Sequence, residues 1–332
     1  MDKIDFVVLW VDGNDPQWIA ERAKYLPKED KSASDPIRFR DWDLMRYWFR
    51  GVEKFAPWVN NIYFVTWGHY PEWLNLEHPK LKIVKHTEYI PHEYLPIFNS
   101  NTIELNLHRI DELSEHFVLF NDNMFLTKAV QPKDFFQNGL PCETVRLGQT
   151  FATSPDDVFN YTIFNNIAII NKYFYKKEVI KKHWRKFLSP KYGRENIRSI
   201  LLLPFGHFSG FLDSHLPASH LKSTFKEIWN KEANVLSESC FCRFRDKKCV
   251  THWVMKNWRF CEGQFEPRSI RWGKSYAIGA DSAMLQELRK QKYYAVCLND
   301  CDSNLDFELH QDQLKAVFEE ILPEKSSFEK EK

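Results

Sequence analysis

An apolar run that ends in an acidic turn constrains the fold of this chain more than any other feature. Residues 4–11 (IDFVVLWV) form the run, and Asp12-Gly13-Asn14-Asp15 form the turn. A short continuous apolar run bounded by turn residues is typical of a buried strand. Comparable segments predict further strands at 61–66, 81–84, 116–120 and 293–298.

Amphipathic patterns between these segments predict helices. Asp41 is placed to cap a helix over 43–55, and Asn101 with Glu104 three residues later resembles a capping box. Strands that alternate with helices predict an α/β fold, with a mostly parallel, Rossmann-like sheet, helices on both faces and an additional helical region in the second half. Later helices are predicted at 218–229, 249–258 and 310–322, and a frayed charged tail at 324–332.

The charge of the chain argues against nucleic acid as a partner. Its 332 residues include 46 Lys and Arg against 45 Asp and Glu, so no overall field attracts a polyanion. The first residues show no signal-peptide pattern, and no apolar run approaches the roughly 20 residues that a membrane-spanning helix needs. We therefore expect a cytoplasmic protein, at most peripheral at the inner face of a membrane, although no strong amphipathic anchor is evident.

The seven cysteines are expected to be free thiols. Cys240, Cys242, Cys249 and Cys261 lie close together in the sequence, but their spacing matches no common zinc site. Buried thiols are therefore the favoured interpretation.

Two predicted strands end in a turn that contains Asn and Asp. These turns are Asn121-Asp122-Asn123 and Asn299-Asp300. In open α/β sheets ligands bind beyond the carboxyl ends of the strands, where a carboxylate can hold Mg²⁺ together with substrate phosphates. Asn and Asp are also ordinary turn residues, so either turn alone is a weak signal.

Basic and histidine residues supply the other candidates. Arg38 and Arg40 lie two apart in an extended segment, a spacing that suits a bidentate clamp on a diphosphate as well as a solvated strand edge. Arg243 and Arg245 repeat the pattern in the second half. His207, His215 and His220 are close in the sequence, and any of them is a candidate general base or a structural histidine.

Several familiar motifs are missing from the sequence. No P-loop pattern, no Gly-x-Gly-x-x-Gly after the first strand and no Gly-x-Ser-x-Gly occurs. ATP-driven, dinucleotide-dependent redox and α/β-hydrolase functions therefore lose support.

Four blocks of the sequence, in order and spanning nearly the whole chain, resemble the Stealth family of sugar-phosphate transferases. Bacterial capsule and exopolysaccharide enzymes belong to this family, as does the eukaryotic enzyme that tags lysosomal proteins with N-acetylglucosamine-1-phosphate. Many relatives carry Asn-Asp-Asp where this chain has Asn121-Asp122-Asn123, a departure that bears on metal stoichiometry. The blocks are 5–18; 38–43, 56–60, 95–101 and 120–125; 215–217 and 243–245; and 297–300 with 323–329.

The resemblance implies a site. His215, Arg245 and Asp122 would be catalytic, and Asp122 with Asp300 would hold Mg²⁺ (or Mn²⁺). The donor would be bound by Asp12, Gly13, Asn14, Asp15, Arg38, Arg40, Asn99, Asn101, Asn121 and Asn299.

The resemblance also implies an organisation and a reaction. Residues 1–332 would form one catalytic domain, with 1–136 and 290–325 as an α/β nucleotide-sugar core and 137–289 as a mainly helical acceptor and catalytic region. The enzyme would transfer hexose-1-phosphate from a UDP-hexose to a saccharide acceptor, lipid-linked in some relatives, and release UMP. Other polysaccharide-synthesis enzymes are candidate partners. Two alternatives stay open: a conventional metal-dependent glycosyltransferase that releases UDP, and a non-catalytic carbohydrate-binding protein.

Overall fold

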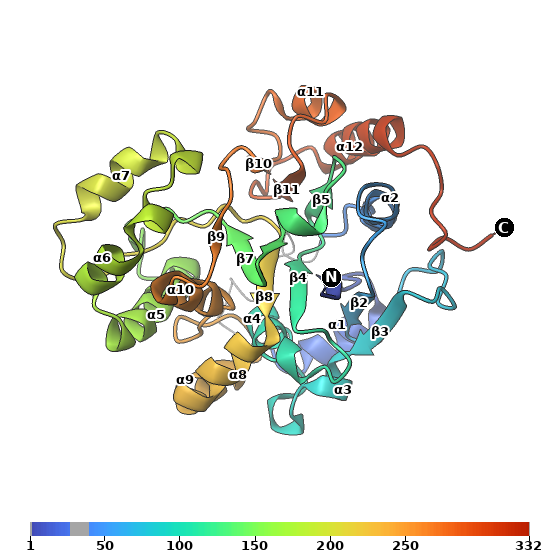
Figure 1. Ribbon diagram of the computed structural model, residues 1–332. Coiled ribbons are helices and arrows are strands. Elements are labelled where there is room, and N and C mark those ends of the chain that lie inside the picture. The colour runs from blue at the N-terminus through green and yellow to red at the C-terminus, as the bar shows by residue number, and fades with distance from the viewer. Residues whose placement is uncertain (1, 27–39, 332) are drawn as a thin grey trace.

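The computed structural model describes residues 2–26 and 40–331, and a five-stranded sheet forms its centre (Figure 1). The strand order is β3-β2-β1-β4-β8. β1, β2, β3 and β4 run parallel, and β8 lies antiparallel to β4 at one edge. The predicted α/β fold with a mostly parallel sheet is therefore confirmed. The bounds are β1 Ile4–Leu9, β2 Ile62–Thr66, β3 Leu81–Lys85, β4 His116–Phe120 and β8 Ala218–Leu221.

Two smaller sheets flank the central one. In the first, β11 pairs in parallel with β10 and antiparallel with β5, so that the late part of the chain returns beside β4. In the second, β7 pairs with β6 and β9. Their bounds are β5 Met124–Leu126, β10 Gly273–Ala277 and β11 Ala295–Asn299, and β6 Phe136–Gln137, β7 Leu140–Glu143 and β9 Glu266–Pro267.

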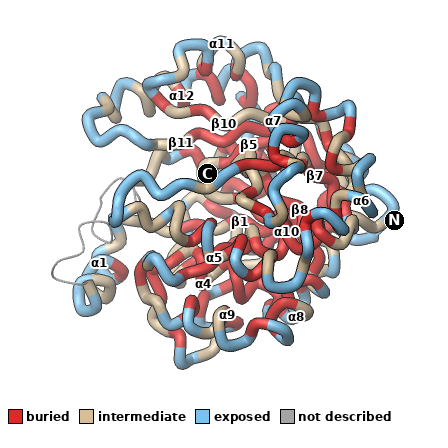
Figure 2. Tube along the Cα trace, turned by 90° about the vertical axis from the view of Figure 1, so that its left-hand side faces the viewer, coloured by how far each residue is buried: buried red, intermediate tan, exposed pale blue. Residues whose placement is uncertain are grey.

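Helices cover both faces of the central sheet and bury a core on each (Figures 1 and 2). The side chains of β1 alternate between the two cores: Phe6 and Val8 join the core under α2 and α12, and Val7 joins the core under α8 and α10. The helices are α1 Pro16–Ala23, α2 Met45–Phe55, α3 His86–Tyr89, α4 Ser100–Leu105, α5 Val158–Tyr173, α6 Lys176–Phe187, α7 Glu195–Leu202, α8 Lys222–Lys231, α9 Ala233–Cys240, α10 Trp253–Glu262, α11 Met284–Arg289 and α12 Phe307–Ile321.

The helix predicted over 218–229 is wrong at its start. Ala218–Leu221 is strand β8, and only then does helix α8 begin. All four strand residues are buried and pair with β4. The local pattern of this segment also suits a helix, but pairing with the edge of the sheet makes it a strand. Helix α10 likewise begins at Trp253 rather than at Cys249.

Two predicted helix caps lie elsewhere. The side chain of Asn99 caps α4 by accepting a hydrogen bond from the backbone N–H of Asn101, which is itself inside the helix. Asp41 accepts a hydrogen bond from the N–H of Asp43 in the turn before α2 (2.7 Å). The N-cap of α2 is Leu44.

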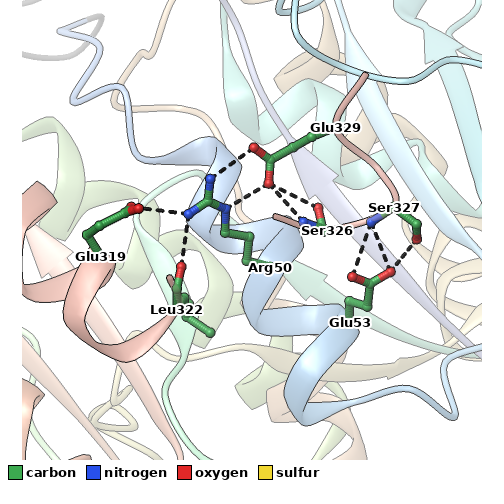
Figure 3. A network of polar contacts seen from close by, with 7 residues as sticks. All are labelled: Arg50, Glu53, Glu319, Leu322, Ser326, Ser327 and Glu329. Carbon is green, nitrogen blue, oxygen red and sulfur yellow. Dashed lines mark hydrogen bonds and ion pairs between the residues drawn. The ribbon is translucent and has the colours of Figure 1, made fainter. Parts of the chain in front are cut away.

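The charged tail is held in place rather than frayed (Figure 3). Nε of Arg50 donates to the carboxylate of Glu329 at 2.7 Å, and both side chains are about 5% exposed or less. Phe328 packs into the core with 3% of its surface exposed. The prediction failed because the partners of the tail lie far away in sequence, on α2 and beside β2.

Among the residues that the structure describes, no helix is long and apolar enough to cross a membrane.

Candidate active site

A cavity of about 690 Å³ opens at the carboxyl ends of β1, β4 and β11. Its volume lies within the range of ordinary ligand sites, and strand carboxyl ends are where α/β folds bind ligands. Segments far apart in sequence meet there. Its lining includes Arg40, Asp41, Trp42, Ser100, Asn121, Asp122, Asn123, Phe159, Asp213, His215, Arg245, Trp253, Asn299 and Asp300.

Asp122 faces the cavity from the turn after β4. Its side chain reaches the cavity, but protein surrounds it on the other sides, and this burial raises its pKa to about 6. The nearby Asp41 carboxylate raises the pKa further, while Arg245 opposes the shift. Asp122 is thus a carboxylate in a crowded acidic corner, which a cation would stabilise.

The turn after β11 (Asn299-Asp300) meets the turn after β4 (Asn121-Asp122-Asn123) at this cavity. Nδ2 of Asn123 donates to Oδ1 of Asn299 at 3.4 Å, which joins the turn after β4 to the turn after β11. Asp300 forms an ion pair with Arg40, with 3.3 Å between the closest nitrogen and oxygen. Burial raises the pKa of Asp300, and Arg40 lowers it in part.

The residues of these two turns fit a divalent cation. Both carboxylate oxygens of Asp300 and Oδ1 of Asn123 are buried without a well-aligned hydrogen-bond donor. Over residues 2–26 and 40–331, no three His, Cys, Asp or Glu side chains gather at metal-site spacing. The two turns bring two carboxylates to the cavity, Asp122 and Asp300, a number that suits Mg²⁺, which takes one or two protein carboxylates and completes its shell with substrate phosphates and water.

His215 enters the cavity from the loop before β8. Its backbone has a φ of +47°, a left-handed conformation that is uncommon outside glycine. The N–H of His215 donates to Oδ1 of Asp213 at 2.6 Å, and its ring packs edge-on against Trp253 with centroids 6.0 Å apart. Burial lowers the pKa of His215, although Asp213 raises it in part, so the ring is neutral at pH 7.

A buried ion network holds the loop that carries His215. The ammonium of Lys256 on α10 forms an ion pair with Asp213 and lies 3.4 Å from the Glu143 carboxylate. Arg268 approaches the same Glu143 at 3.5 Å. Burial lowers the pKa of Lys256, but Asp213 and Glu143 outweigh it and the net shift is upward. No sequence pattern marked Lys256, Asp213 or Glu143 as site residues.

Arg245 is exposed to the cavity and is anchored by its neighbours. Its guanidinium donates to Oγ of Ser100 at 2.9 Å. The side-chain amide of Asn99 donates to the carbonyl oxygens of Cys242 (3.0 Å) and Phe244 (3.2 Å), and the ring of Phe244 stacks on Phe98. Asn99, predicted to bind the donor, is fully buried and holds the loop of Arg245 instead.

The other predicted donor residues have varied positions. Asn121, Asn299 and Arg40 line the cavity. The turn 12–15 follows cavity-lining residues but does not line the cavity itself: the N–H of Asp12 donates to His69, and Asp15 caps α1. Asn101 is buried within α4 away from the lining, and Arg38 lies outside the described residues.

The three neighbouring histidines do not form one cluster. His220 is buried in β8, where Nε2 lies 2.9 Å from Nδ1 of His252. Burial lowers the pKa of both, for His252 to about 3, so the pair is neutral. His207 is exposed beside Tyr175. Only His215 of the three lines the cavity.

No site role was predicted for Asp41, which the sequence marks as a helix cap within the family block 38–43. It lines the cavity, and burial together with Asp43 and Asp12 raises its pKa. For Lys256 no sequence signal exists, because nothing in the sequence brings α10 beside Asp213.

Comparisons with known proteins identify the class of enzyme to which the chain belongs. The capsular polysaccharide phosphotransferase WcwK of Streptococcus pneumoniae is 45% identical, over 99% of this chain and 100% of that protein. The exopolysaccharide phosphotransferase cps2G of Lactiplantibacillus plantarum is 39% identical (98% and 96%), and the receptor polysaccharide phosphotransferase WefC of Streptococcus oralis is 40% identical (99% and 100%). The protein is therefore a transferase of phosphorus-containing groups.

The family follows from the same comparisons. Residues 2–30 match Stealth protein conserved region 1, and residues 38–143 match conserved region 2. The chain belongs to the Stealth family. A solved structure of the bifunctional glycosyltransferase WbbM is 9% identical over 95% of this chain and 50% of its own length, with a TM-score of 0.39, which is too low to support any argument.

Proposed function

We propose that this enzyme transfers hexose-1-phosphate from a UDP-hexose to a saccharide hydroxyl and releases UMP. One observation carries the proposal. A single cavity is lined by His215, Arg245 and Asp122, which come from three distant parts of the chain, and by the turns after β4 and β11. A neutral imidazole, a guanidinium and a cation-binding corner are the groups that phosphoryl transfer needs.

The proposed step begins at the acceptor. The acceptor oxygen attacks the β-phosphorus of the donor, and His215 takes the hydroxyl proton on its ring nitrogen. The bond between the β-phosphorus and the bridging oxygen breaks, and UMP leaves with the electron pair. The lowered pKa of His215 keeps the imidazole neutral and able to accept a proton at pH 7.

Positive groups offset the charge of the diphosphate. Arg245 lines the cavity and would bind the transferred phosphate, and Arg40 lines the same cavity beside Asp300. Mg²⁺ (or Mn²⁺) bound at Asp122 and Asp300 would supply Lewis-acid neutralisation of the phosphate oxygens. The carboxylates of Asp122 and Asp300 would fix the place of that charge.

The names of these relatives place their activity on capsular, receptor and exopolysaccharides. We extend this substrate class to the present chain: the acceptor is a growing surface polysaccharide, carried on a lipid at the inner face of the membrane. Other enzymes of polysaccharide synthesis would supply the acceptor and use the product.

The identity of the released nucleotide tests the proposal. Purified protein is incubated with Mg²⁺, a panel of UDP-hexoses and a short saccharide acceptor, and the products are identified by mass. We expect UMP and an acceptor heavier by one hexose-phosphate. UDP with an acceptor heavier by one hexose would instead establish a conventional glycosyltransferase.

Replacing Asp122 by asparagine keeps the shape of the turn but removes its charge. We expect turnover to fall by about 100-fold or more, with a higher Mg²⁺ concentration needed for half-maximal rate. Because the raised pKa of Asp122 is about 6, the wild-type rate should fall as pH drops through 6 and the carboxylate is protonated.

The measurement is kcat against Mg²⁺ concentration and pH, together with Mn²⁺ binding by electron paramagnetic resonance. The control is Asp111→Asn, an exposed carboxylate before the other end of β4, which should match the wild type. A wild-type enzyme that is fully active without metal contradicts the role of Asp122.

A further inference from the structure

Helix α7 carries an apolar stripe on its outer face. Ile197, Ile200 and Leu201 are 61%, 51% and 69% exposed, and Phe205 just beyond the helix is 56% exposed. This spacing puts Ile197, Ile200 and Leu201 on one side of the helix, while Leu202 on the other side is buried. Single exposed apolar residues are common on protein surfaces, but a contiguous row usually marks an interaction site.

Helix α6 lies next to α7 and extends this surface. The ammonium of Lys176, at the start of α6, donates to the carbonyl oxygen of Leu202 at the end of α7, so the two helices are joined. Tyr175 and Trp184 expose 46% and 53% of their surfaces. Both helices lie at the side of the molecule opposite the C-terminus (Figure 1).

The same surface is strongly basic. Residues 175–205 contain nine Lys and Arg against two Glu, although the whole chain has 46 basic and 45 acidic residues. Most of these basic side chains are exposed: Lys177, Lys181, Lys182, Arg185, Lys191, Arg194 and Arg198.

We propose that this α6–α7 surface (residues 175–205) docks on an anionic lipid bilayer. The stripe of α7 would enter the boundary between headgroups and acyl chains, and the surrounding Lys and Arg would contact the anionic headgroups. Exposed Trp and Tyr side chains are favoured at that depth. The helices lie on the membrane and do not cross it.

The positive charge of the α6–α7 surface favours an anionic lipid bilayer over a protein as its binding partner. In a symmetric pair of chains the same patch would face itself, and its excess of positive charge would repel. Lysine is also depleted at protein–protein interfaces, whereas a basic rim around an apolar stripe is typical of helices that lie on membranes.

The position of the surface suits a lipid-linked acceptor, a consequence that rests on the proposed function. Helix α5 joins the α6–α7 surface to the cavity: it ends at Tyr173, two residues before the surface, and Phe159 near its start lines the cavity. At 1.5 Å per residue its length is about 24 Å. A saccharide attached to a lipid in the bilayer would therefore have to span a distance on the order of the length of α5 to reach the cavity.

Co-sedimentation with vesicles tests the docking without relying on the reaction. The full chain is mixed with vesicles of phosphatidylcholine alone or with an equal part of phosphatidylglycerol, at low and at high salt. We expect binding to the anionic vesicles that is at least tenfold stronger than to the neutral ones and that weakens in high salt.

Two double variants separate the apolar and the charged contributions. I200S/L201S and K181E/K182E should each lower vesicle binding at least tenfold. Matched controls are Leu309→Ser, half-exposed on α12, and K226E/K290E, which makes the same charge change at exposed sites elsewhere. Every variant should keep the wild-type melting temperature and the wild-type rate with a water-soluble acceptor.

Three outcomes overturn the docking. The wild type fails to bind anionic vesicles at low salt, the I200S/L201S variant binds as well as the wild type, or light scattering shows a dimer that I200S/L201S dissociates. Because nucleotide release with a soluble acceptor is measured separately, failure of the docking and failure of the proposed reaction are distinguished.

Discussion

Replacing His215 by alanine is expected to lower kcat by about 10³-fold while the KM for the nucleotide sugar changes little. A positioned general base contributes about 10²–10⁴-fold to a proton-transfer step. Two histidines of the described residues line the cavity, His86 and His215, and burial lowers the pKa of His215, which keeps its ring in the basic form. Steady-state rates of UMP release over a range of donor concentrations measure both constants.

The control for this variant is His207→Ala. His207 is exposed and does not line the cavity, so its removal should leave kcat within about twofold. Retention of more than a tenth of the wild-type rate in His215→Ala would mean that another group takes the proton. Donor binding, measured by calorimetry, should be preserved in the variant because His215 acts on the acceptor.

Replacing Lys256 by methionine is expected to lower the free energy of unfolding by about 3–5 kcal/mol. Methionine fills a similar volume but leaves the buried Asp213 carboxylate without its cation and leaves Glu143 with Arg268 alone, and breaking a buried ion pair from one side has this cost. Turnover should also fall, because Asp213 accepts the hydrogen bond that holds the backbone of His215. Urea unfolding at pH 7 gives the first quantity and UMP release the second.

The pH dependence gives Lys256→Met a distinct signature. In the wild type, burial raises the pKa of Asp213, but the charge and the hydrogen bond of Lys256 outweigh this effect, so the pKa is lowered overall. Its stabilising contribution is present above the ordinary pKa of an aspartate and is lost as pH falls through the lowered value. In the variant, burial without the charge of Lys256 raises the pKa of Asp213, so the deficit relative to the wild type should shrink as pH falls from 7 to 5.

Lys290→Met removes an exposed lysine and should leave the unfolding midpoint unchanged. If Lys256→Met has the same urea midpoint as the wild type at pH 7, the buried network does not support the loop. If its deficit grows toward pH 5, the assignment of Asp213 as the unpaired carboxylate is wrong.

Much of the fold could be predicted because its signals are local. The apolar runs of β1, β2 and β4 are continuous, as expected of strands buried on both faces. Strand β8 was missed because Ala218–Leu221 has no strong pattern of its own and becomes a strand by pairing with β4. The tail was misjudged because its charge suggests solvation, whereas Glu329 is bound by Arg50 on α2.

The sequence identified the residue types of the site but not their assembly. His215, Arg245 and Asp122 came from motifs that resemble a family, and their catalytic roles stay predictions. Site roles for Asp41 and Lys256 were not predicted, because these roles depend on neighbours that are distant in the chain. Asn99 lies inside a recognisable block, yet its buried amide fastens a loop, so a matching motif does not separate a residue that binds substrate from one that positions it.

By itself, the sequence determined the family, the α/β fold class and most of the parallel strands, because apolar runs and turn residues act over a few neighbouring positions. Only the tertiary structure decided which polar groups share the cavity and which apolar face stays outside. In α7 both sides are apolar, so periodicity alone does not tell Leu202 from Leu201. Packing against the rest of the chain makes that choice, because burial depends on contacts between segments that the sequence keeps far apart.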